Sequence, residues 1–100
     1  MFVILTSKPG QYTTYTNPDI ELLEVWDYLF YGRKQAQFFV GRLLRETRVR
    51  VVEADDSAIV NWVPSKFLER FDTLEQAHRE LQSLCHFGNL DAKLEAVTLP

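Results

Sequence analysis

The sequence predicts an α+β fold, in which an antiparallel sheet of about five or six strands packs one face against a single long helix. Short runs rich in aromatic and β-branched residues recur along the chain, separated by turn-forming residues. One later stretch, residues 73–85, has its apolar residues at helical spacing. With 100 residues and a 46% hydrophobic composition, the chain has the size of one globular domain, which we assign to residues 1–100.

The chain opens with a short apolar strand. Residues 2–6 are apolar at almost every position, which is typical of a central strand with both faces covered. Pro9 and Gly10 then suit a type II turn. The polar stretch 11–18 is interpreted as a long loop or an edge strand, and its Asn17-Pro18 pair as a turn or the start of a helix.

The central third of the chain fits two patterns. At a period of 3.6 residues it forms a helical hairpin, with helices over 18–31 and 34–46 that break at Gly32. At a period of two it forms a β-hairpin that turns near Gly32, with strands over about 24–31 and 36–43. Many of its residues are aromatic or β-branched and lose side-chain freedom in helices, so composition favours the strands. The helical hairpin is kept as the alternative.

A second β-hairpin is expected over residues 47–63. Val49 and Val51 alternate with arginines, which is the pattern of a strand with one wet face. An aspartate-rich turn then leads to a returning strand. After this hairpin, Ser65 is expected to cap a short helical turn over 66–70.

The predicted helix over 73–85 has signals at both of its ends. Asp72 is the expected N-cap, with Glu75 at the capping-box position. Its apolar stripe consists of Leu74, Ala77, Leu81 and Leu84. The helix is expected to end within 86–89, where Gly88 or Asn89 can adopt left-handed geometry, and residues 92–99 are expected to form an edge strand.

The charges are unevenly distributed along the chain. Only Glu46 opposes the six basic residues between positions 33 and 50, whereas the region 53–80 is rich in acids. Both tryptophans are expected to fill the core, with a surface contact patch as the alternative for Trp62. The residues predicted to bind a partner are Arg33, Lys34, Arg42, Arg45, Arg48, Arg50 and Trp62.

No group of residues has the spacing of a known catalytic site. Cys85 and His86 are adjacent, but neighbouring helical side chains point about 100° apart, so Cys85 is expected to pack as a small hydrophobe. His78 can meet Glu75 one turn away. Asp27, in a strand, faces opposite to its aromatic neighbours and is interpreted as lying on a solvated sheet face or as a partner for an arginine. We assign no catalytic residue, cofactor or metal site.

These observations favour a non-enzymatic interaction or accessory domain that binds a protein partner, or a second copy of itself, through an aromatic and arginine-rich face. One alternative is a small-ligand-binding or cofactor-free enzyme domain with a pocket between sheet and helix, to which Asp27, His78 or a tyrosine contributes. Another is nucleic-acid binding through the Arg42–Arg50 strip. The single cysteine and the absence of a long apolar run predict a cytoplasmic protein without a membrane span.

Overall fold

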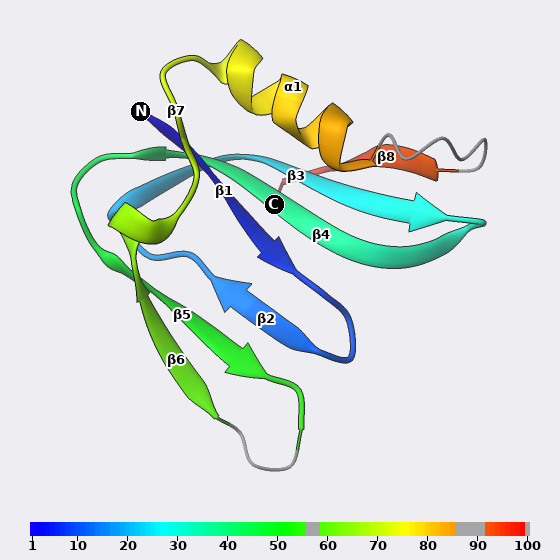
Figure 1. Ribbon diagram of the computed structural model, residues 1–100, viewed down its shortest axis with the longest axis horizontal. Coiled ribbons are helices and arrows are strands. Elements are labelled where there is room, and N and C mark those ends of the chain that lie inside the picture. Colours follow the sequence, from blue (N-terminus) through cyan, green and yellow to red (C-terminus); the bar gives the residue numbers. More distant parts are fainter. Residues whose placement is uncertain (56–58, 86–91, 100) are drawn as a thin grey trace.

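The computed structural model describes residues 1–55, 59–85 and 92–99. Two antiparallel sheets and one helix make up the fold (Figure 1), with strand orders β7-β1-β4-β3-β8 and β2-β5-β6. The α+β class is confirmed, with the strands divided between two sheets. No helix in the described ranges is long and apolar enough to cross a bilayer. The elements are β1 (Phe2–Ser7), β2 (Tyr12–Tyr15), β3 (Ile20–Phe30), β4 (Arg33–Leu43), β5 (Arg48–Glu53), β6 (Val60–Pro64), η1 (Ser65–Phe67), β7 (Arg70–Phe71), α1 (Leu74–Cys85) and β8 (Ala92–Val97).

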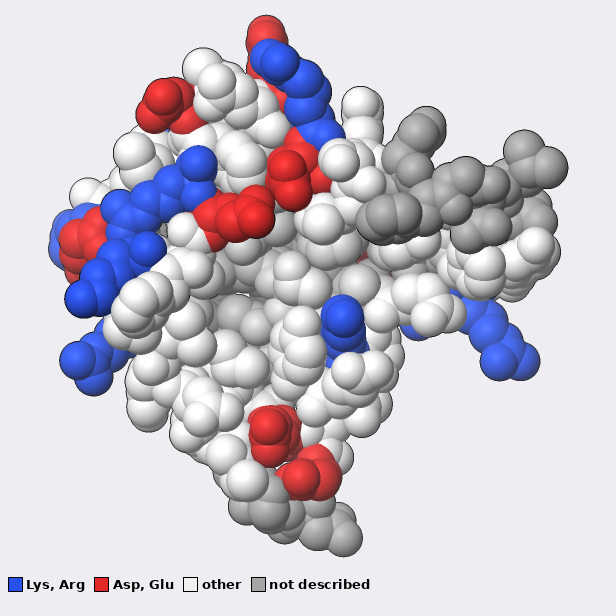
Figure 2. Space-filling view, in the orientation of Figure 1, with Lys and Arg blue, Asp and Glu red and all other residues white. Residues whose placement is uncertain are grey.

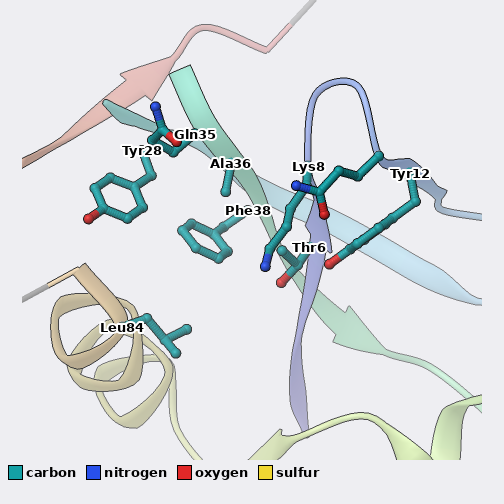
Figure 3. A pocket seen from close by; sticks show the side chains of 9 residues that line it. Thr6, Lys8, Tyr12, Tyr28, Gln35, Ala36, Phe38 and Leu84 are labelled. Carbon is teal, nitrogen blue, oxygen red and sulfur yellow. The ribbon is translucent and has the colours of Figure 1, made fainter. Parts of the chain in front are cut away.

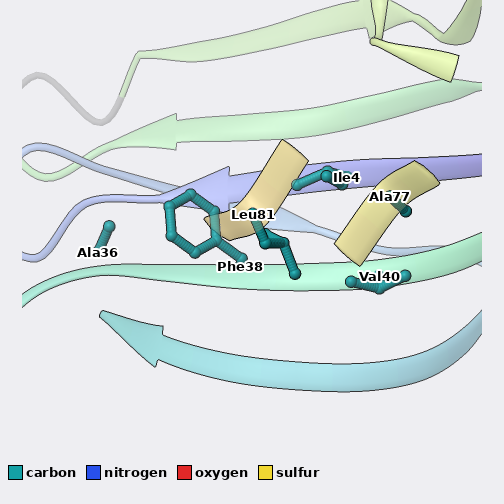
Figure 4. Packing of buried hydrophobic residues seen from close by; sticks show 6 residues of the cluster. All are labelled: Ile4, Ala36, Phe38, Val40, Ala77 and Leu81. Carbon is teal, nitrogen blue, oxygen red and sulfur yellow. The ribbon is translucent and has the colours of Figure 1, made fainter. Parts of the chain in front are cut away.

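Strand β1 is buried on both faces and separates two hydrophobic clusters. On one face Ile4 packs with side chains of β4 and α1 (Figure 4), in the cluster of Ile4, Ala36, Phe38, Val40, Ala77 and Leu81. On the other face Val3 and Leu5 pack with Ile20 and with Val49 of the smaller sheet. The predicted central strand with two covered faces is therefore confirmed, because alternate side chains of β1 enter different cores.

The central third of the chain is an extended β-hairpin, β3–β4, so the helical alternative is wrong. Phe30 pairs with Arg33, which leaves Tyr31 and Gly32 as a two-residue turn. Both turn residues have positive φ, 51° and 74°, as a type I′ hairpin turn requires. Gly32 reads locally as a helix stop, but here its left-handed freedom closes a strand pair.

A β-bulge at Leu23 changes which side chains of β3 face the helix. Leu22 pairs with Gly41 and Glu24 pairs with Val40, so Leu23 is the additional residue. Val40 belongs to the cluster beneath the helix. The bulge therefore turns Glu24 toward the helix-facing side, whereas regular alternation would leave Leu22 and Glu24 on the same face.

The smaller sheet contains the predicted β5–β6 hairpin, although residues 56–58 of its loop lie outside the described part of the chain. Its third strand, β2, is the edge strand that the sequence left open. The helix-start interpretation of Asn17 is wrong. Asn17 Oδ1 accepts a hydrogen bond from the Asp19 amide at 2.8 Å, and its carbonyl accepts one from the Ile20 amide at 3.0 Å, so the segment is a turn.

The helix α1 lies where the sequence predicts it, but its cap is one residue later. Thr73 Oγ1, rather than the Asp72 carboxylate, accepts a hydrogen bond from the Gln76 amide at 3.2 Å. The Gln76 side chain accepts one in return from the Asp72 amide at 3.0 Å. Thr73 and Gln76 therefore form an arrangement similar to a capping box, in which the glutamine accepts from the residue before the cap. The predicted helix end at 86–89 lies outside the described residues, and the final edge strand is confirmed as β8.

The predicted helical turn over 66–70 is shorter, and Arg70 instead begins strand β7 beside β1. Ser65 does not cap this turn. It is 1% exposed, and its hydroxyl accepts a hydrogen bond from the Thr47 amide and donates one to the Glu46 carboxylate, both at 2.9 Å. Glu46 also lies 2.6 Å from Arg70, so this carboxylate connects the β4–β5 segment to β7.

Gly41→Ala should destabilise the fold. A Cβ at this position would lie 2.6 Å from Cγ2 of Ile20 and 3.1 Å from the carbonyl oxygen of Glu21. Overpacking of this kind costs about 1–3 kcal/mol, which urea denaturation can measure. Adding Ile20→Ala should make the combined loss smaller than the sum of the two single losses. An unchanged free energy of unfolding in Gly41→Ala would contradict this strand register.

The Glu46–Arg70 contact should make stability depend on pH. Hydrogen bonds from Arg70, and secondarily from Ser65, lower the pKa of Glu46 below its ordinary value. A carboxylate with a lowered folded pKa stabilises the protein above its unfolded pKa, and this contribution is lost as pH falls through the folded value. Glu46→Gln should therefore lower the melting temperature at neutral pH and converge with the wild type in acid. The exposed Glu69→Gln is the control, and a pH-independent loss in Glu46→Gln would contradict the ionic account.

Candidate functional site

The strongest candidate site is the face of the smaller sheet that points away from the core. Tyr15 pairs with Arg50, and Arg50 pairs with Trp62, so three strands present one row of side chains on the same face. Val49, one position away, is buried on the opposite face against the larger sheet. We call this surface the outer face and define it by Tyr15, Arg48, Arg50, Val52, Val60 and Trp62.

The outer face exposes large apolar side chains. Trp62 is 59% exposed, Val60 44% and Tyr15 42%. Val49 of β5 and Val63 of β6 pack in the second core, so the alternation that places them there also places these side chains in solvent. Grouped exposed aromatic and aliphatic residues are typical of interaction surfaces. The expectation that Trp62 fills the core is wrong, and the surface-patch alternative agrees with its exposure.

A shallow hollow lies between the β2–β3 turn and the strands β5 and β6. Its volume is about 200 Å³, and its walls are Tyr15, Thr16, Asn17, Arg48, Arg50 and Trp62. The Arg50 guanidinium carbon lies 4.4 Å from the centre of the Tyr15 ring. The side-chain amide of Asn17 donates a hydrogen bond to the Arg48 backbone carbonyl at 2.8 Å, which holds the turn against β5. These two contacts position the Asn17 and Tyr15 sides of the hollow.

The predicted basic residues do not form a continuous strip. Three of them bind the protein's own acids in the pairs Lys34–Asp27 at 3.2 Å, Arg42–Glu21 at 3.4 Å and Arg45–Asp19 at 2.8 Å. Arg33 lies at the turn of the β3–β4 hairpin, away from the smaller sheet. In Figure 2, blue and red side chains likewise lie against each other over the upper part of the view.

Arg48, Arg50 and Trp62 are the predicted site residues that the structure brings together. Both arginines are exposed, and within the described part of the chain neither one forms an ion pair. Tyr15 belongs to the same row, but the sequence analysis missed it because its segment was left as loop or edge strand. The alternation of threonine and tyrosine in β2 was the available signal.

The other candidate side chains have structural partners. The Asp27 carboxylate lies 3.2 Å from the Lys34 ammonium and accepts a hydrogen bond from the Gln37 side-chain amide at 2.9 Å, so its partner is a lysine and not the expected arginine. His78 does not meet Glu75. Its Nε2 lies 2.7 Å from a Glu24 carboxylate oxygen, which also accepts a hydrogen bond from the Trp26 indole at 2.9 Å.

The side chain of Cys85 and all of His86 lie outside the description. Among the residues that are described, no three His, Cys, Asp or Glu side chains lie close enough together to hold a metal ion.

Comparison of the chain with models of protein families, with curated proteins and with solved structures finds no match.

Replacing Trp62 with threonine should leave stability almost unchanged. An exposed aromatic residue on a sheet face contributes little to the core, so the free energy of unfolding should change by less than about 0.5 kcal/mol. Trp26→Phe is the comparison, because it removes the indole that donates to Glu24 and should destabilise by about 1 kcal/mol. Urea denaturation measures both, and a larger loss in the Trp62 variant would contradict its outward placement.

Proposed function

We propose that this protein is a non-enzymatic interaction domain that binds an acidic segment of a partner protein on its outer face. The observation that carries the proposal is the row Tyr15, Arg50 and Trp62, exposed and in register across three strands. Tryptophan, tyrosine and arginine are the residue types that contribute most to binding energy at protein interfaces.

The charge of the outer face favours an acidic partner. Arg48 and Arg50 extend into solvent without an ion pair to any described residue, whereas Arg42 and Arg45 have acidic partners within the chain. A carboxylate of a partner can therefore bind either of the first two without breaking an existing pair. Complementary charge of this kind sets specificity and speeds association.

The same charges disfavour self-association through this face. A two-fold symmetric dimer places the same patch of both copies in contact. Arg48 and Arg50 of one copy would then face the like charges of the other, which costs free energy. We therefore commit to a different protein as the occupant, with a self-associated form as an outcome that the experiment can detect.

The edge of the smaller sheet adds a second point of attachment. Strand β6 ends the order β2-β5-β6, so in the described part of the chain one of its sides is unpaired. Its residues include the exposed Val60 and Trp62. An extended partner segment can hydrogen-bond to such an edge while its side chains reach the outer face. A cytoplasmic accessory subunit is the setting we propose, on the basis of the single cysteine.

Selection from a random peptide library displayed on phage tests this proposal. The wild-type protein should enrich peptides that combine Asp or Glu with aromatic or aliphatic residues. Arg50→Glu and Trp62→Ser should each weaken binding of a selected synthetic peptide by about tenfold or more. Arg33→Glu is the matched control, because Arg33 is also exposed but lies at the end of the β3–β4 hairpin.

Three results would contradict the proposal. Selected peptides without an excess of Asp or Glu would contradict the preference for an acidic partner. Equal binding of a selected peptide by the wild type and by Arg50→Glu would show that the peptide does not bind at the outer face. Tighter binding of a single-stranded oligonucleotide than of any selected peptide, lost in Arg50→Glu and falling steeply with salt, would favour the nucleic-acid alternative. Light scattering of the wild type alone would reveal self-association.

A further inference from the structure

A second cavity lies between the larger sheet and the C-terminal end of α1 (Figure 3). Its volume is about 480 Å³, within the range of small-molecule sites. The residues that line it are Thr6, Lys8, Gln11, Tyr12, Tyr28, Gln35, Ala36, Phe38 and Leu84. None of these residues belongs to the outer face, so this cavity is a separate site.

The centre of the cavity is apolar because it continues the core beneath the helix. Ala36 and Phe38 belong to the buried cluster that packs against α1. Phe38 pairs with Thr6, and Ala36 pairs with Tyr28, so all four side chains lie on the helix-facing side of the sheet. Leu84, on the last turn of α1, forms the opposite wall and is 39% exposed. An aromatic ring placed here would contact Phe38 and Leu84.

One end of the cavity is cationic and rich in hydroxyl groups. In Figure 3 the polar ends of Lys8, Thr6 and Tyr12 point toward the same region of the cavity. A tight turn sets this geometry. Lys8 and Tyr12 exchange two backbone hydrogen bonds of 3.0 Å, and the Gln11 amide donates to the Lys8 carbonyl at 3.0 Å. Gly10 has a φ of 76°, which agrees with the predicted type II turn.

The opposite end of the cavity is polar because of a bulge. Tyr28 pairs with Ala36 and Leu29 pairs with Lys34, so Gln35 is the additional residue of β4. Regular alternation would point Gln35 away from the helix side, but this residue lines the cavity. Bulges often redirect a side chain in this way beside functional sites.

We infer that this cavity binds an aromatic monocarboxylate. Within the described residues Lys8 forms no ion pair, so its ammonium is available to a ligand carboxylate, with the hydroxyls of Thr6 and Tyr12 as further donors. The apolar centre formed by Phe38 and Leu84 receives the ring. The cavity thus has a cationic end at Lys8, an apolar centre at Phe38 and Leu84, and a neutral polar end at Gln35. A ligand with a single negative charge at one end would fit this arrangement.

Titration with naphthoate, followed by amide resonances in NMR, tests the inference. Resonances of Lys8, Tyr12 and Ala36 should shift, and the neutral naphthamide should bind more weakly. Lys8→Met keeps the aliphatic stem and removes the charge, so it should lower naphthoate affinity by about fivefold or more and change naphthamide affinity by less than about twofold. Lys66→Met, at an exposed lysine outside the cavity, is the matched control and should bind as the wild type does.

A second variant tests the apolar part of the site. Leu84→Ala should weaken naphthoate and naphthamide by the same factor, about three- to tenfold, because it removes ring contact and not charge. No shift at millimolar naphthoate in a folded wild-type protein would overturn the inference. Equal binding of acid and amide, or equal loss in Lys8→Met and Lys66→Met, would overturn the role of Lys8. None of these outcomes depends on the outer face.

Discussion

The burial of strand β1 on both faces is the constraint on which the rest of the structure depends. Its side chains alternate between two cores, with Ile4 beneath the helix and Val3 and Leu5 against the smaller sheet. Two different layers must therefore cover this strand. Because the smaller sheet covers the second face with one side only, its other side reaches solvent with Tyr15 and Trp62 exposed. The candidate binding surface is therefore the solvent-exposed side of the same sheet that covers the second face of β1.

Departures from regular pairing place polar groups at the helix-facing side of the larger sheet. The bulge at Leu23 turns Glu24 toward α1, where it meets His78 and the Trp26 indole. The bulge at Gln35 brings an amide to the cavity at the other end of the helix. The local geometry of β3 and β4 therefore determines which polar chemistry the helix side contains.

Sequence reasoning predicted what depends on local pattern and missed what depends on long-range pairing. The alternation around Val49 and the apolar spacing in α1 are local, and both elements lie where they were expected. The pairing of the strands determines both the division into two sheets and the separation of Arg42 from Arg50. The periodicity of side chains along the sequence does not specify which strands pair. The sequence thus placed Arg48, Arg50 and Trp62 among the candidate binding residues, but not Tyr15, whose position is set by pairing with Arg50.

Nuclear Overhauser contacts in a methyl-labelled sample test the central claim most directly. This claim is that the smaller sheet packs its inner side on β1 and leaves its outer face in solvent. The account predicts cross-peaks from the Val49 methyl groups to those of Val3 and Leu5, and none from the Trp62 indole to either residue. Cross-peaks between the Trp62 indole and Leu5, with Val49 lacking contacts to β1, would contradict it.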